Sequence, residues 1–308
     1  MITKLLLYKI LQLFIMMVIG FVLAKCGIIK REQSDVLSKL CLYLFMPLAI
    51  INAFHFQRSS AMTQGLLLAF ASAILMHIAF WLLDRIFLKS KKLRPVERLS
   101  IMYPNAANLI LPVVSYVLGE EWVVYSTAYL SVQLLFLWSH GIRIFSPDTR
   151  IDLKKILLNP TIIAIALGLV LLIFHVRLPS FATDITTTFG NMMGPIGMLA
   201  AGVLATRVKL KTAIKNKRMY LVSLVRIIAY PVLTILIAKV LSLLPIAQGK
   251  EVLLIPFLAS TAPTATTIVQ FAQLKNADTN LAVEINVCST ILSIVTIPIW
   301  VVLYSAFL

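Results

Sequence analysis

Two asparagines stand between two prolines inside a long apolar run of the chain. The run covers roughly residues 96–117 and contains the stretch Tyr103-Pro-Asn-Ala-Ala-Asn-Leu-Ile-Leu-Pro112. A run of this length can cross a bilayer as a helix, but each proline removes a backbone donor and clashes with the preceding turn. We therefore predict a helix that is broken near its middle. Amide side chains and freed backbone N–H groups at such a break could bind a carboxylate by hydrogen bonds alone.

The second half of the chain repeats this arrangement. Pro256 and Pro263 stand seven positions apart, and hydroxyl side chains surround them. A broken backbone in hydrocarbon is costly unless it lines a cavity or is buried in protein, so two interrupted spans at matching places predict the binding site of a transporter. The candidate binding residues are Asn105, Asn108, Pro112, Asn191, Thr261, Pro263 and Thr264.

A structural role is the alternative for these groups. Asn105 and Asn108 could hydrogen-bond between membrane helices, and the threonines of 261–267 could cap freed backbone instead of binding a ligand. Asn191 is a candidate because its span could reach the site from a different set of helices.

The composition is that of a helical membrane protein that crosses the bilayer several times. Hydrophobic residues make up 60% of the 308 residues, charged residues only 13%, and the mean hydropathy is +0.95. Soluble domains are nearer half apolar and a quarter charged. The net charge of +16 comes from short basic clusters between apolar spans. Such clusters indicate membrane topology and contact with anionic lipid, so we do not expect nucleic acid as a partner.

Ten apolar segments can be drawn along the chain, and basic residues gather in alternate connections. The rule that positive connections stay inside places these connections in the cytoplasm and both termini outside. We therefore predict an all-α protein of about ten transmembrane helices in the cell membrane. The segments lie near 5–24, 34–54, 62–88, 96–117, 123–143, 160–176, 185–206, 219–244, 251–273 and 279–305.

Prolines recur at a nearly constant offset between the two halves. With an odd number of spans in each half, the halves must have opposite topology. We predict two inverted five-helix repeats, residues 1–143 and 160–308, joined by a cytoplasmic connection over 144–159, with broken crossover helices as the fourth and ninth. The matched pairs are Pro47 with Pro195, Pro104 with Pro256, and Pro112 with Pro263.

Motifs along almost the whole chain resemble those of the auxin efflux carrier family, in a bacterial, malate permease-like form. They occur in the order that the family shows, although glycines that the family usually has between Asn105 and Pro112 are replaced, for example by Ala107 and Ile110. The motifs are Gly20–Ile29, Leu42–Pro47, Asn105 with Pro112, Asn159-Pro160, Gly190–Gly202, Arg226 with Pro231, Pro263, and Ser289-Thr290 with Pro298.

The resemblance implies a crossover fold and the passage of carboxylates, such as auxin in plants and malate in bacteria. It also implies that the third to fifth and eighth to tenth helices move against the first, second, sixth and seventh, as in an elevator. A homodimer is compatible with this plan.

Few ionisable residues lie inside the predicted spans. Arg226 and Glu284 lie deepest and are candidates for ion coupling or for a structural ion pair. Asp84 stands near a span end, where solvation is expected, while His77 and His140 are expected to be isolated, packed and neutral.

The predicted function is a secondary carrier that moves small organic anions, mono- or dicarboxylates, by alternating access. An anion channel and a non-transporting membrane sensor or assembly subunit are the alternatives. No enzyme motif, phosphate-binding loop or metal-ligand cluster stands out, so we expect no enzymatic activity, no cofactor and no metal. The particular acid, the direction of transport and any coupling to protons or sodium stay open.

Overall fold

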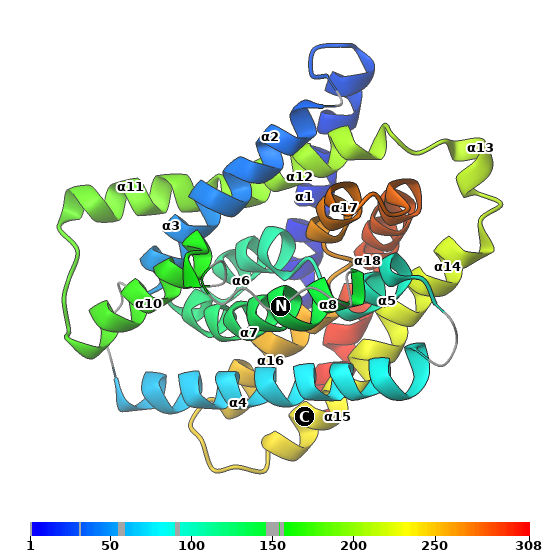
Figure 1. Ribbon diagram of the computed structural model, residues 1–308. Helices are drawn as coiled ribbons and strands as arrows, with labels where there is room; N and C mark the ends of the chain where they lie inside the picture. The colour runs from blue at the N-terminus through cyan, green and yellow to red at the C-terminus, as the bar shows by residue number, and fades with distance from the viewer. Residues whose placement is uncertain (1, 31, 55–58, 90–92, 146–153, 155–156) are drawn as a thin grey trace.

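The computed structural model describes residues 2–30, 32–54, 59–89, 93–145, 154 and 157–308, and within these ranges the regular structure is helical (Figure 1). Segments labelled η are π-helical, except that η4 is a 3₁₀ turn. In chain order the elements are α1 (Ile2–Lys25), α2 (Gln33–Leu40), η1 (Cys41–Phe45), α3 (Met46–Ala53), α4 (Ser60–Leu83), η2 (Asp84–Leu88), α5 (Pro95–Met102), η3 (Ala106–Ile110), α6 (Leu111–Val117), η4 (Glu120–Trp122), α7 (Val123–Phe136), η5 (Leu137–Gly141), α8 (Ile142–Phe145), α10 (Pro160–Ile173), α11 (Ser180–Asn191), α12 (Met193–Ala205), α13 (Leu210–Ala213), α14 (Lys217–Leu224), η6 (Val225–Ala229), α15 (Tyr230–Leu241), α16 (Gly249–Thr261), α17 (Thr266–Leu274) and α18 (Thr279–Phe307).

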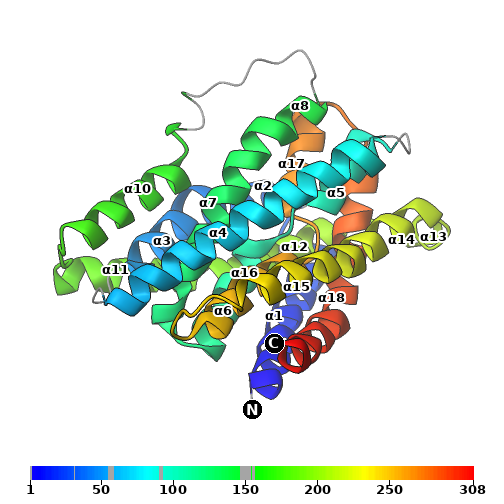
Figure 2. The ribbon, with the colours of Figure 1, turned by 90° about the horizontal axis from the view of Figure 1, so that it is seen from below.

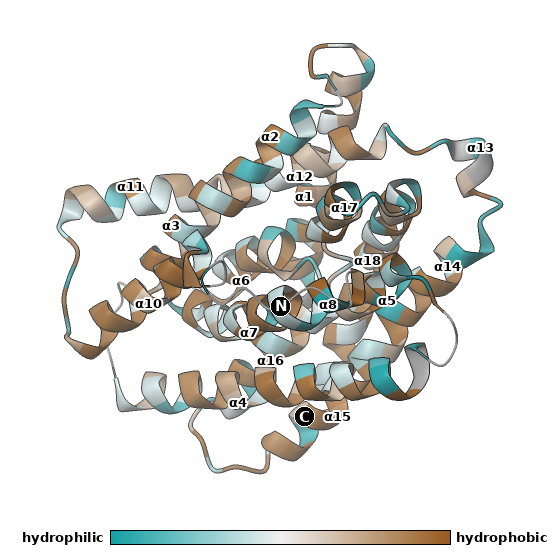
Figure 3. Cartoon of the chain, viewed as in Figure 1, coloured by the Kyte–Doolittle hydropathy of each residue, from teal (hydrophilic) through white to brown (hydrophobic). Residues whose placement is uncertain are grey.

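Helix covers most of each predicted apolar segment. Apolar residues dominate the long helices, whereas hydrophilic residues gather near helix ends and connections (Figure 3). The connection predicted over 144–159 lies largely outside the described residues. Within the described residues, six helical segments are long and apolar enough to cross a membrane: Lys4–Lys25, Gln33–Ala53, Ser60–Ile86, Ser180–Ala205, Lys217–Leu241 and Thr279–Phe307.

Two of the remaining segments are broken, each at one proline. Helix α5 ends at Met102 and helical backbone resumes at Ala106, so the first break lies at Pro104. Helix α16 ends at Thr261 and α17 begins at Thr266, so the second break contains Pro263.

The prediction that matched Pro112 with Pro263 is wrong in register. Pro112 lies in the first turn of α6, directly after the π-helical segment η3. The first turn of a helix tolerates a missing N–H, and the change of hydrogen-bond pattern in η3 accommodates the proline ring. Pro256 likewise stays inside α16. Proline therefore permits a break at these sites without dictating which proline makes it.

The helices pack as two groups. In one group α1 packs against α12, while α10 and α11 pack against α3; in the other, α4, α7, α15, α16 and α18 pack around the broken helices. Figures 1 and 2 show α4 and α11 on opposite sides of the molecule with the broken helices between them. The groups meet where α1 contacts α6 and α18, and where α12 contacts η3.

Glycine allows the closest helix contact, between α1 and α12. A Cβ atom on Gly202 would overlap the carbonyl of Met17, and one on Gly20 would overlap the carbonyl of Leu199. Small residues let membrane helices approach until their backbones touch, which replaces the hydrophobic drive that lipid does not supply. Helices α1 and α12 therefore form a tightly packed pair beside the broken helices.

Candidate functional site

The two breaks pair with each other as a short antiparallel bridge between Pro104 and Thr264. The Asn105 N–H donates to the Pro263 carbonyl at 2.7 Å, and the Ala265 N–H donates to the Tyr103 carbonyl at 2.9 Å. Backbone groups that lie outside a helix at membrane depth must find partners. Here each break satisfies the other, and this joins two segments that are far apart in the sequence.

A side-chain amide supports each break from a neighbouring helix. Gln133 on α7 donates through Nε2 to the Pro104 carbonyl at 2.8 Å, and Asn286 on α18 donates through Nδ2 to the Thr264 carbonyl at 2.7 Å. The hydroxyl of Ser289 also accepts from the Thr264 N–H at 3.1 Å. The two supporting amides occupy comparable places in the two halves.

Arg226 joins the helix ends that lead into the breaks. Its side chain is completely buried and donates to the carbonyls of Ile101 at 3.0 Å, Ala262 at 3.1 Å and Ser260. These acceptors lie at the C-terminal ends of α5 and α16, where helix carbonyls lack partners within the helix. The guanidinium also lies 5.0 Å from the ring centre of Tyr230.

The helix dipoles explain how a lone buried arginine is accommodated. A helix C-terminus carries roughly −0.5 of an elementary charge, so two of them supply about −1 beside one guanidinium. The same argument applies with opposite sign on the other side of the breaks. There the N-termini of η3–α6 and of α17 together supply about +1, without a cationic side chain.

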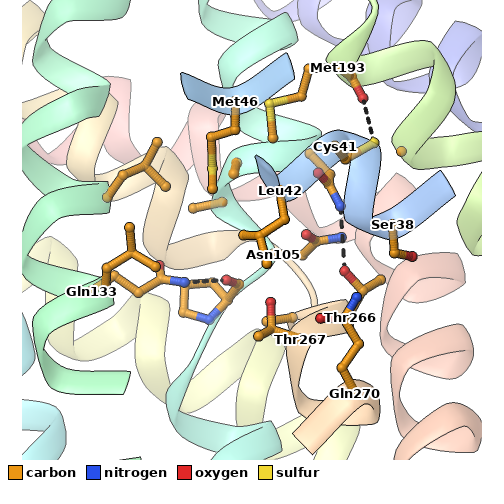
Figure 4. A pocket seen from close by; sticks show the side chains of 18 of the residues that line it. Ser38, Cys41, Leu42, Met46, Asn105, Gln133, Met193, Thr266, Thr267 and Gln270 are labelled. Carbon is orange, nitrogen blue, oxygen red and sulfur yellow. Dashed lines mark hydrogen bonds between the residues drawn. The ribbon is translucent and has the colours of Figure 1, made fainter. Parts of the chain in front are cut away.

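A small cavity lies against these N-termini (Figure 4). It encloses about 60 Å³, which is room for about two water molecules at ~30 Å³ each, or for one carboxylate group. Both packing groups line it, because α2, η1 and α12 face the broken helices across it. The lining residues are Ser38, Cys41, Leu42, Met46, Pro104, Asn105, Ala106, Ala107, Asn108, Leu130, Gln133, Leu134, Leu137, Met193, Gly197, Ala200, Ala265, Thr266, Thr267 and Gln270.

The polar groups of this cavity are amides, hydroxyls and backbone N–H groups. Asn105 is 8% exposed, and the described residues offer its side-chain amide no hydrogen-bond partner. Asn108 donates through Nδ2 to the Thr266 hydroxyl at 3.4 Å, which links the first turns of the two half-helices. The first N–H groups of those turns have no acceptor within their own helix. The lining contains no acidic or basic side chain, so the helix ends dominate its electrostatics.

A second cavity of about 380 Å³ holds two further predicted site residues, Pro112 and Asn191. Lys9 and Glu120 also line it, and Met193 lines both cavities. The seven candidate binding residues are therefore divided between two cavities and the break.

The remaining threonine candidates hold backbone rather than line either cavity. Thr261 donates to the Leu258 carbonyl at 2.7 Å, within its own helix. Thr264 is fully buried and donates through its hydroxyl to the Ser100 carbonyl at 2.9 Å. Their neighbours Thr266 and Thr267 line the first cavity instead.

Arg226 and Glu284 do not pair with each other in the structure. Arg226 is bound by helix-end carbonyls, whereas Glu284 accepts a hydrogen bond from Asn216 Nδ2 at 2.7 Å. Glu284 lies near the beginning of α18, far along that helix from the group that supports the break. The charge of Arg226 is balanced by helix ends, so it needs no acidic partner.

Two expectations for ionisable groups are wrong. Asp84 is fully buried, not solvated, and both of its oxygens accept from Arg98, at 2.7 and 2.6 Å. His140 is not isolated, because Nε2 lies 3.3 Å from Asp84 and Nδ1 lies 3.3 Å from the Tyr103 hydroxyl. His77 does pack among aromatic rings, those of Phe80, Tyr129 and Phe136.

Sequence reasoning missed Ser38 and Gln270 in the cavity and Asn286 behind the break. Ser38 and Gln270 carry no signal, because single polar residues near span ends are common. Asn286 gave a signal that could have been used: it is an amide inside an apolar span, three residues before Ser289, at a place comparable to Gln133 in the first half.

Two discontinuous membrane helices that meet beside a small polar cavity define a class, the helical membrane transporters. A model of the membrane transport protein family matches this chain over residues 5–150 and again over 148–301. The chain therefore belongs to that family, which confirms the resemblance to auxin efflux carriers, and it is a membrane transporter, not an enzyme. No curated protein matches the chain.

Proposed function

We propose that the protein is a secondary carrier for small organic anions, mono- or dicarboxylates, and that it holds one carboxylate in the cavity beside Asn105. The observation that carries this proposal is the arrangement of the two half-helix N-termini. Both adjoin one enclosed cavity that lacks charged side chains, and together they offer about +1 of charge and several free N–H donors. One carboxylate fits this charge and these donors.

The proposal includes ten transmembrane helices arranged as two inverted repeats, residues 1–143 and 160–308, with the broken helices crossing between them. Three observations support it: helix covers each predicted segment, the family model matches in two successive stretches, and the breaks pair in antiparallel fashion. The protein would then lie in the cell membrane with both termini outside.

Alternating access follows from how the packing groups share the first cavity. Because each group contributes one wall, a movement between the groups would open the site to one side and then to the other. The cavity holds a carboxylate group but not a complete dicarboxylic acid, so this structure corresponds to a closed arrangement. The second cavity, which shares Met193 with the first, would lie on a path to the opposite side.

Counterflow in proteoliposomes tests the proposal. Vesicles loaded with an unlabelled C4 dicarboxylate such as malate should accumulate labelled malate transiently, whereas vesicles loaded with the uncharged diamide should not. Repeating the assay with proton and sodium gradients would identify any coupling ion. A steady ionic current in planar bilayers would instead indicate an anion channel. Absence of both counterflow and current across a panel of mono- and dicarboxylates would refute the proposal.

A further inference from the structure

A third cavity, of about 630 Å³, lies between η2 at the end of α4 and the segment η5–α8. Basic groups line it from both sides: Arg85 and Lys89 from the first segment, and His140 and Arg143 from the second. Arg98 reaches it from α5. It lies apart from the cavity beside Asn105, and the carrier function proposed above makes no use of it.

The positive charge of this cavity is largely uncompensated. The acidic group next to it is Asp84, which is buried behind the lining and bound by Arg98 and His140. In the described part of the chain, Arg85, Lys89 and Arg143 are exposed and have no carboxylate partner. Arg85 instead lies 5.4 Å from the ring centre of Trp81. Three cations thus face a site where an anion would be attracted.

The surroundings of the cavity favour a lipid over a soluble anion. Leu82 on α4 and Leu135 on α7 are 43% and 47% exposed, so the helices that form the cavity present apolar side chains to the bilayer. Trp81 adds an aromatic ring of the kind that gathers at the level of lipid headgroups. A basic pocket above an apolar helix face matches both parts of a phospholipid, its phosphate and its acyl chains.

We propose that this cavity binds the headgroup of an anionic phospholipid. Arg85, Lys89 and Arg143 contact its phosphate and any further negative group, and its acyl chains lie along the apolar faces of α4 and α7. Arg98 and His140 form the floor of the site and remain bound to Asp84.

Native mass spectrometry of the full-length protein tests this, with micelles that contain equal amounts of phosphatidylglycerol and phosphatidylcholine. The parent protein should retain phosphatidylglycerol preferentially. The variant Arg85→Gln/Arg143→Gln should lose that preference by on the order of twentyfold, since each cation near a phosphate contributes about fivefold. The control Lys215→Gln/Lys217→Gln removes the same charge from exposed positions elsewhere and should bind as the parent does.

Three outcomes would overturn the proposal: unchanged preference in the cavity variant, an equal loss in the control, or equally tight binding of soluble glycerol phosphate. The last would assign the site to a free phosphate compound. If the double variant fails to fold, the exposed single substitution Arg143→Gln keeps the test usable, with an expected loss of about fivefold.

Discussion

The N–H of Asn105 donates to the carbonyl of Pro263 at 2.7 Å, so the backbone of one broken helix is bonded directly to the backbone of the other. The same residue places its side-chain amide in the cavity beside the helix ends (Figure 4). Its backbone therefore holds the site together while its side chain stays available to a ligand. These two roles can be separated by mutation, because substitutions of the side chain leave the backbone bond in place.

Changing Asn105 to Asp should abolish tight binding of the acid. A carboxylate at this position repels the bound anion, while removal of the amide in Asn105→Ala loses a donor worth ~1–3 kcal/mol, or about fivefold to a hundredfold in affinity. The measurement is ligand binding by calorimetry at neutral pH. Asn276→Asp makes the same chemical change in an exposed turn and should bind normally. Equal affinity for the Asn105→Asp variant and the parent would move the anion site elsewhere.

Changing Arg226 to Met should destabilise the whole protein. The carbonyls of Ile101, Ala262 and Ser260 would be left buried without donors, at ~1–3 kcal/mol each. Chemical unfolding in detergent measures the loss. Arg226→Lys keeps the charge, but a single ammonium cannot span the ends of α5 and α16 as the planar guanidinium does, so we expect only partial recovery. A Met variant as stable as the parent would contradict this account of the buried arginine.

Two glycines of α12 should respond differently to the same substitution. A Cβ on Gly197 would lie 3.0 Å from Asn108 Cγ and push that side chain into the cavity, so Gly197→Ala should weaken ligand binding by ~tenfold. Gly202→Ala would instead force α12 away from α1, at ~1–3 kcal/mol of stability. Binding and thermal unfolding measured on both variants test this. The contrast fails if the two variants lose binding and stability in the same proportion.

Changing Asp84 to Asn should cost about 3–5 kcal/mol in unfolding free energy, because Arg98 would keep its charge in a largely buried place without an anion. Asp278→Asn is the matched control. Asp278 pairs with Arg94, both are about 40% exposed, and its oxygen also caps α18. Exposed pairs contribute at most ~1 kcal/mol, and asparagine caps a helix equally well. Similar losses in the two variants would show that burial of the Asp84 pair does not matter.

The predicted orientation can be tested with an impermeant thiol reagent on intact cells, with Cys26, Cys41 and Cys288 replaced. New cysteines at Glu121 and Ala247, which are exposed, should react from outside. Cysteines at the exposed positions Lys89 and Lys215 should react only after the membrane is opened. The reverse pattern would invert the topology, and a mixed pattern would change the number of spans.

The sequence by itself was sufficient for the class of protein, the positions of the helices and the residues at the centre of the site. Long apolar runs act locally, since each must be helical to satisfy its own backbone in lipid. Proline and asparagine in the middle of such a run mark a place where that solution fails. For this reason Asn105 and Pro263 could be named in advance, together with the family to which the chain belongs.

Tertiary structure alone decided which proline interrupts each helix and what the polar groups around the breaks bind. The break forms at Pro104 and not at Pro112 because the backbone at Pro104 finds partners in the other broken helix and in Gln133. Arg226 binds helix-end carbonyls that lie 34 to 125 positions away in the sequence. Asp84 is buried because Arg98 and His140 reach it from other helices. These partners come together only when the helices pack, so no local pattern of residues encodes them.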